Sequence, residues 1–192
     1  MLSKMSKKTA VLLLMLLLAA ALFGAGTMYR DLKDSVDPGT AGAAQSGEEE
    51  VSYTAPDFNF RDGAGNEYWL SDFVGKPTVV NFWTSWCTYC VGDMPNFQEA
   101  FDTYGEEINF LMVNLTSYMG DSREKADAII EEGKYTFPVY YDTSGGAVNA
   151  YGIRGVPLSL FIDAEGNLVT YANGALEAEL LEKALGYIYE GE

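Results

Sequence analysis

Short apolar segments alternate with turn-rich segments along the chain from Tyr53 to its end. Apolar runs of about four to eight residues, continuous or alternating, predict strands. Longer segments with apolar residues every three or four positions predict helices. On these rules we expect strands at 58–60, 68–70, 78–83, 108–115, 137–141, 158–162 and 168–171, and helices at 87–104, 121–133, 147–151 and 176–189. This alternation of strands and helices predicts an α/β domain with a mixed sheet.

Turn and capping residues mark several borders between these elements. Glycine-rich turns at 62–66 and 163–167 each join two of the expected strands into a hairpin. The segment 121–124, Asp-Ser-Arg-Glu, resembles a capping box at the start of a helix. We expect Pro95 to bend the helix 87–104, because proline removes a backbone donor. In the last helix, the expected apolar face consists of Leu176, Leu180, Leu181, Ala184 and Leu185.

Residues 9–29 carry no charged side chain and are mostly Leu, Ala and Met. A run of this length can cross a bilayer as a helix. Three lysines precede it, so the positive-inside rule places the N-terminus in the cytoplasm. We expect residues 1–34 to be a cytoplasmic N-terminus with a single-pass anchor in the cell membrane, which places the C-terminal domain outside the cytoplasm. Small residues at 19–21 and 24–26 leave open a cleaved signal peptide and a secreted protein.

Residues 35–52 predict an acidic flexible linker, because they combine Gly, Ala and Ser with a run of three glutamates and show no apolar period. A domain at 53–192 follows. The hydrophobic fraction of 48% and the 10 Phe and 13 Tyr residues suffice for a packed core. From Ser35 onward the chain has 26 acidic and 7 basic residues. This charge argues against nucleic acid as a partner and against docking on anionic lipid.

Cys87 and Cys90 are the only cysteines in the chain. They follow the apolar run 78–83, where a strand hands over to a helix. Free N–H groups and the dipole at a helix N-terminus favour the thiolate form of Cys87. Cys90 lies one turn further along the same helix face, within reach of a disulfide bond with Cys87. The pair therefore predicts a reversible dithiol–disulfide centre.

Two other uses of such a pair stay open at this point. Zinc normally takes four Cys, His or carboxylate ligands. The chain has no histidine and no third cysteine, so we expect no metal site. A purely structural disulfide would close a very short loop, which stabilises a fold least in the chain-entropy model.

The segment 80–90, Val-Asn-Phe-Trp-Thr-Ser-Trp-Cys-Thr-Tyr-Cys, together with Gly155-Val-Pro157, resembles the thioredoxin-like proteins. The likeness is strongest to the membrane-tethered TlpA/ResA-type thiol-disulfide oxidoreductases. The stretches 55–58, 70–76, 93–95 and 160–167 fit the same subgroup, and the resemblance covers about 53–189. It implies a thioredoxin-like fold with a central mixed sheet, an N-terminal β-hairpin extension and a helical insertion around 122–133.

The resemblance also implies roles for the two cysteines and their surroundings, without a cofactor. Cys87, expected to be exposed, would attack a client disulfide, and the more buried Cys90 would resolve the mixed disulfide. Pro157 matches a cis-proline that faces the pair, which would leave the backbone of Val156 free to bind an extended substrate. Asp93 is a candidate proton relay for the buried thiol. Its alternative role is a charge early in a helix.

Three residues around the cysteines complete the expected substrate site. Trp86 would shape the site by packing, Thr88 could donate a hydrogen bond to the thiolate, and Tyr89 would supply bulk. Asn81 stands where thioredoxin carries a buried acid, so that proton route is missing.

Three functions remain in competition. The first is a reductase of client protein disulfides, serving cytochrome c maturation or regeneration of methionine sulfoxide reductases and supplied by a membrane electron donor of the CcdA/DsbD kind. The second is a disulfide-forming oxidase, which the lack of a histidine beside Cys87 disfavours. The third is a peroxiredoxin-like thiol peroxidase, suggested by the stretch 55–58 and by Thr84 three residues before Cys87, although Val80 replaces the matching proline.

Overall fold

The computed structural model describes residues 53–116, 118 and 120–189. Its strands are β1 (Asn59–Arg61), β2 (Glu67–Trp69), β3 (Thr78–Trp83), β4 (Asn109–Asn114), β5 (Val139–Tyr141), β6 (Leu158–Ile162) and β7 (Leu168–Asn173). Its helices are η1 (Leu70–Phe73), α2 (Thr88–Tyr104), α3 (Arg123–Gly133), α4 (Gly146–Tyr151) and α5 (Ala178–Leu185). The expected anchor and linker at 1–52 lie outside the described residues. Of the helices within the described ranges, none is long and apolar enough to span a membrane.

The strands form one sheet in the order β2-β1-β5-β4-β3-β6-β7. The three central strands β3, β4 and β5 run parallel. The hairpin of β1 and β2 adds to one edge and the hairpin of β6 and β7 to the other, all with antiparallel pairing. The predicted mixed sheet and thioredoxin-like fold are confirmed. The N-terminal hairpin is present, and α3 is the helix inserted between β4 and β5.

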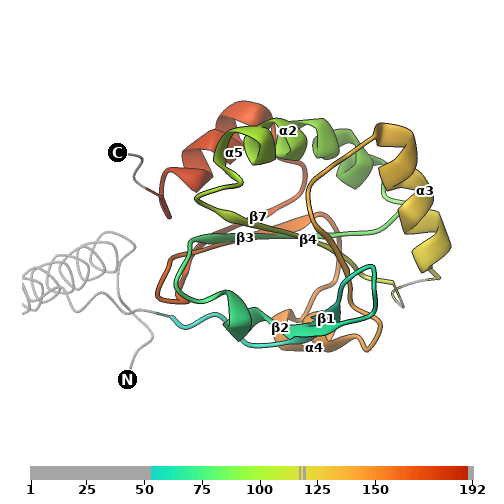
Figure 1. Ribbon diagram of the computed structural model, residues 1–192, viewed down its shortest axis with the longest axis horizontal. Coiled ribbons are helices and arrows are strands. Elements are labelled where there is room, and N and C mark those ends of the chain that lie inside the picture. The colour runs from blue at the N-terminus through green and yellow to red at the C-terminus, as the bar shows by residue number, and fades with distance from the viewer. Residues whose placement is uncertain (1–52, 117, 119, 190–192) are drawn as a thin grey trace, which may run out of the picture. The chain divides into compact units, whose positions relative to one another are not determined.

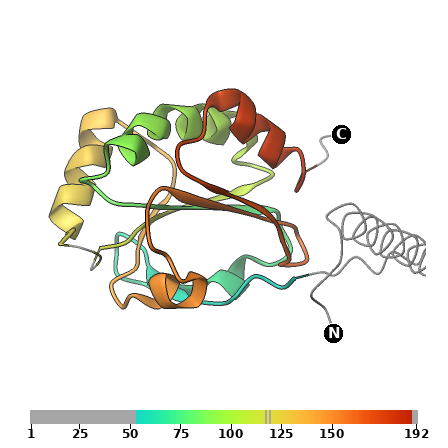
Figure 2. The ribbon, with the colours of Figure 1, turned by 180° about the vertical axis from the view of Figure 1, so that it is seen from behind.

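Strand β3 is buried along its whole length, so its side chains supply both layers of the core. Val79 and Trp83 point to the face covered by α2, α3 and α5. Val80 and Phe82 point to the opposite face, where α4 and the β1–β2 hairpin lie. Figures 1 and 2 show α2 and α5 together on one side of the sheet and α4 on the other. Successive side chains of a strand point to opposite faces, so a strand buried on both faces has a continuous apolar run, as the sequence of β3 has.

The last helix differs from its prediction. Helix α5 begins at Ala178, so Leu176 lies before it, although its side chain is buried. Leu180 is 54% exposed, so its expected place on the apolar face was wrong. The buried residues Leu181, Ala184, Leu185 and Ile188 follow the i, i+3, i+4, i+7 pattern of a single stripe. Leu180 lies about 100° around the helix from its neighbour Leu181 and so at the edge of that stripe.

Pro95 lies inside α2, which continues through it from Thr88 to Tyr104.

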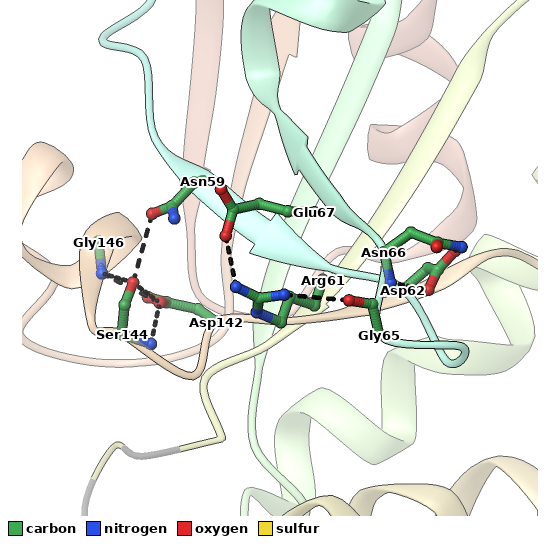
Figure 3. A network of polar contacts seen from close by, with 9 residues as sticks. All are labelled: Asn59, Arg61, Asp62, Gly65, Asn66, Glu67, Asp142, Ser144 and Gly146. Carbon is green, nitrogen blue, oxygen red and sulfur yellow. Dashed lines mark hydrogen bonds and ion pairs between the residues drawn. The ribbon is translucent and has the colours of Figure 1, made fainter.

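On the opposite face of the sheet, the buried carboxylate of Asp142 precedes α4. Its oxygens accept hydrogen bonds from the backbone N–H groups of residues 144–147. Ser144 also contacts Asn59 of β1, as Figure 3 shows beside the ion pair of Arg61 and Glu67. Asp142 thus satisfies the free donors of this helix start, and Ser144 ties the same segment to the hairpin.

Candidate active site

Cys87 and Cys90 form a disulfide bond at the junction of β3 and α2. Their sulfur atoms are 2.15 Å apart and their Cα atoms 5.2 Å apart. Cys87 is the N-cap of the 17-residue helix α2, and its sulfur accepts a hydrogen bond from the backbone N–H of Cys90 at 3.1 Å. A donor and a helix N-terminus directed at the same sulfur stabilise negative charge on it. Reduction would therefore create a Cys87 thiolate that the N–H donor and the helix N-terminus stabilise.

Both cysteines are buried in this disulfide form. Cys87 is 7% exposed and Cys90 is 2% exposed, so the expectation of an exposed Cys87 is wrong for this form. The carbonyl oxygen of Val156 lies 3.6 Å from the Cys87 sulfur and covers it from the side of the β6 lead-in. The order of exposure still makes Cys87 the more accessible of the two sulfurs.

The segment before β6 faces the disulfide. The peptide bond between Val156 and Pro157 is cis. The two residues line an open groove of about 550 Å³, which is formed by residues 151–158 together with Asn173 and Gly174. Val156 therefore both lines this groove and contacts the Cys87 sulfur through its carbonyl oxygen.

Aromatic side chains around the pair divide into one buried and two exposed residues. Trp83 is buried beneath the pair, whereas Trp86 is 48% exposed and Tyr89 is 74% exposed. Trp86 is thus about half buried, and its expected part in shaping the site stays a prediction. Thr88 is also exposed, and its hydroxyl makes no hydrogen bond to any residue in the described ranges. Trp86 and Tyr89 present apolar surface at the rim of the disulfide.

Asp93 is buried on α2, one turn beyond Cys90. One oxygen of its carboxylate accepts a hydrogen bond from the backbone N–H of Leu176 at 2.9 Å. Burial raises the pKa of Asp93 above its ordinary value, and this hydrogen bond offsets part of the rise. Residues three apart on a helix lie on the same face, so Asp93 and Cys90 share a buried face of α2.

The sequence did not reveal the part played by Asp121. Its buried carboxylate accepts hydrogen bonds from the backbone N–H and the hydroxyl of Ser85, at 2.8 and 2.5 Å. It also accepts from the side-chain amide of Asn114 at 2.9 Å and from the N–H of Ser122 at 2.9 Å. Ser122, not Asp121, caps α3. Asp121 therefore fixes the turn directly before the cysteines to β4 and to the inserted helix. An aspartate one residue before a serine cap was the only local signal, and its partner lies 36 residues away.

Other polar groups beneath the pair make few contacts. Asn81 donates a hydrogen bond to the Ser159 hydroxyl across β3 and β6 at 2.9 Å. The indole N–H of Trp83 and the hydroxyl of Thr84 are buried and have no hydrogen-bond partner within the described residues. In the same residues, no group of three or more Cys, Asp or Glu side chains is placed to hold a metal ion.

Comparisons with known proteins agree with this geometry. Residues 51–171 match the family model described as the AhpC/TSA family. The chain is 32% identical over 136 residues to the thiol-disulfide oxidoreductase ResA of Geobacillus kaustophilus, covering 70% of this chain and 76% of the relative. Among solved structures, StoA from Bacillus subtilis is 26% identical with a TM-score of 0.59, covering 68% of this chain and 96% of that one. The exposed lipoprotein thioredoxin of Streptococcus pneumoniae is 32% identical with a TM-score of 0.57, covering 67% and 97%.

These relatives indicate thiol–disulfide exchange. The cysteine pair at a strand–helix junction and the thioredoxin-like sheet agree with it. The chain belongs to the AhpC/TSA family of thioredoxin-like proteins and is a thiol-disulfide oxidoreductase.

Proposed function

We propose that this protein reduces disulfides in client proteins outside the cytoplasm. The observation that carries the proposal is the environment of the Cys87 sulfur, which receives one backbone N–H at a helix N-terminus. In the described residues no cation is ion-paired or hydrogen-bonded to either sulfur. Strong stabilisation of the thiolate makes a dithiol oxidising, so modest stabilisation favours a reductant.

The reaction runs from the reduced form to the disulfide form. The Cys87 thiolate attacks one sulfur of the client disulfide, which breaks that bond, forms a mixed disulfide and releases the other client sulfur as a thiolate. The Cys90 thiolate then attacks the Cys87 sulfur and releases the second client sulfur. Two protons reach the client thiolates, two electrons pass to the client, and the protein is left with the Cys87–Cys90 disulfide.

Asp93 is proposed to take the proton of Cys90 before the second step. Its buried place on the same helix face and its raised pKa support this role, since a raised pKa brings the proton affinity of a carboxylate closer to that of a thiol. Trp86, Thr88, Tyr89, Val156 and Pro157 form the proposed substrate surface. The two exposed rings supply apolar contact there, and the cis bond at Pro157 leaves the Val156 backbone beside the sulfur.

The proposed electron source rests on the family resemblance, and the proposed location on the apolar segment near the N-terminus. A protein that ends each cycle as a disulfide needs a donor, and outside the cytoplasm that donor must bring electrons through the membrane. We infer a membrane carrier of the CcdA/DsbD kind. Residues 9–29 support a single-pass anchor that holds the domain there. Clients in cytochrome c maturation or methionine sulfoxide reductase regeneration fit such a reductant.

A trapping experiment tests the proposal. Cys90→Ser leaves attack by Cys87 intact and removes resolution, so mixed disulfides with clients should accumulate on non-reducing gels. Cys87→Ser should trap nothing and should abolish reduction of insulin disulfides by the reduced protein. Trapping by Cys87→Ser alone would reverse the two roles. Failure of the reduced wild-type protein to reduce insulin, together with turnover of hydrogen peroxide, would replace the reductase with a peroxidase.

A further inference from the structure

The groove lined by Val156 and Pro157 is also lined by an arginine that makes no ion pair with any described residue. Arg154 lies two residues before Val156, is exposed and lines the groove. The other two arginines in the described ranges are paired with carboxylates, Arg61 with Glu67 at 2.5 Å and Arg123 with Asp127 at 3.4 Å. Within those ranges, Arg154 has neither an ion pair nor a hydrogen bond from its side chain.

The charge of the groove differs from that of the rest of the domain. Residues 53–189 contain 20 acidic and 7 basic side chains. Nevertheless, no Asp or Glu is among the groove-lining residues, and Arg154 is the one full charge among them. The single other ionisable side chain in the groove is Tyr151, whose hydroxyl donates to the carbonyl of Pro56. The groove is thus a local positive site in an acidic domain.

The short stretch of chain between Arg154 and Val156 limits how far the Arg154 backbone lies from the reacting sulfur. The Val156 carbonyl is 3.6 Å from the Cys87 sulfur. Two residues of chain span at most about 7 Å, so the Arg154 backbone lies within that distance of the Val156 backbone. Consider a client whose cysteine is bonded to Cys87 and whose chain follows this groove. Its residue two or three positions from that cysteine would then lie near Arg154.

We propose that Arg154 selects clients that carry a carboxylate two or three residues from the reacting cysteine. This inference rests on the proposed reductase function and names the substrate class of that site. The chemistry favours a carboxylate because a guanidinium offers paired N–H donors that match its two oxygens. The negative charge of the domain repels an acidic client at long range, so Arg154 supplies the local attraction that such a client needs.

The test uses the reduced full-length protein and pairs of disulfide-containing peptides that differ at one position. The peptides carry Glu or Gln two residues before or two residues after one cysteine, and kcat/KM is measured for each. A solvent-exposed pair of this kind predicts about a two- to fivefold preference for a Glu peptide at one of the two positions. The preference should fall as salt is raised, because the pair is solvent-accessible.

Substitutions of Arg154 test whether this residue causes the preference for Glu peptides. Arg154→Gln should bring the Glu-to-Gln ratio of kcat/KM to about one, and Arg154→Lys should retain part of it. Lys183→Gln removes the same charge from the exposed surface of α5, outside the groove, and should keep the wild-type ratio. Equal rates for Glu and Gln peptides in the wild type, or a preference that survives in Arg154→Gln, would overturn the assignment while the reductase stands. Failure to reduce any peptide would refute the reductase itself, and the client preference with it.

Discussion

Asp93→Asn is the substitution that separates a chemical role of this carboxylate from a structural one. The Asp93 carboxylate accepts the N–H of Leu176, and Asn96 of the same helix donates its side-chain amide to the Leu176 carbonyl at 2.8 Å. The two side chains together bind both backbone groups of Leu176 and hold the segment before α5 against α2. Asparagine retains an oxygen that can accept the Leu176 N–H, so this attachment survives the substitution, while the titrating group is lost.

The effect on stability depends on pH with a defined sign. Because burial raises the pKa of Asp93 in the folded state, the folded protein holds this proton more tightly than the unfolded chain does. The stabilising contribution is complete below the ordinary aspartate pKa, and it is lost as pH rises through the raised value. Each pKa unit between the two states corresponds to about 1.4 kcal/mol. Asp93→Asn has no such loss, so its stability relative to wild type should increase with pH over this window.

Urea unfolding of the oxidised proteins between pH 3 and 8 measures this difference. At neutral pH, Asp93→Asn should be at least as stable as wild type, because removing a buried charge outweighs about 1 kcal/mol of charge assistance in one hydrogen bond. Asp102→Asn removes an exposed carboxylate from the same helix and should keep the Asp93-dependent fall of the wild type. Parallel profiles for wild type and Asp93→Asn would refute the raised pKa. If the profiles differ but resolution of mixed disulfides keeps its rate, Asp93 is a structural group and no proton relay.

Three further outcomes are expected. Asp121→Ala removes four hydrogen bonds and leaves buried donors without a partner, so it should destabilise the fold by about 2–4 kcal/mol. It should also shift the midpoint potential of the cysteine pair. An unchanged potential would show that Asp121 has a purely structural role. The midpoint itself, titrated in dithiothreitol buffers and followed by Trp fluorescence, should lie nearer about −270 mV than about −120 mV, and a value at the upper end would make the protein an oxidase. The full-length protein should sediment with membranes and be cut by protease added outside intact cells, while recovery of soluble protein from the medium would indicate signal cleavage.

The local pattern of the sequence sufficed for the sheet and for the position of the cysteines. The continuous apolar run 78–83 predicts a buried strand, and the alternation of side chains along any strand places Val79 and Trp83 on one face and Val80 and Phe82 on the other. The strand–helix junction at Cys87 follows from the end of that run. In the last helix the pattern was ambiguous, because adjacent leucines at 180 and 181 both fit an apolar stripe and only packing against α2 selects Leu181.

Long-range contacts account for what the sequence did not reveal. Ser85 and Asp121 are distant in the chain, and no local rule pairs them. The burial of Cys87 arises because the segment containing Val156, 69 residues away, packs on its sulfur. Two tryptophans three residues apart likewise differ, since Trp83 is fully buried in the core with both cysteines and Trp86 is 48% exposed. A single residue's type and neighbours therefore specify its helix or strand, but not which distant segment covers it.

Three buried carboxylates of the described residues have no Lys or Arg partner, and two of them position segments around the cysteine pair. Asp93, Asp121 and Asp142 are each buried, and each is held by N–H donors or side-chain donors instead of Lys or Arg. Asp121 fixes the turn before Cys87, and Asp93 fixes the segment before α5 against the helix that Cys87 begins. Such hydrogen-bonded groups orient loops without bringing positive charge to the sulfurs. The cysteine pair is thereby positioned firmly, and its thiolate is stabilised by a helix N-terminus and one N–H but by no Lys or Arg among the described residues, which supports the proposed reductant.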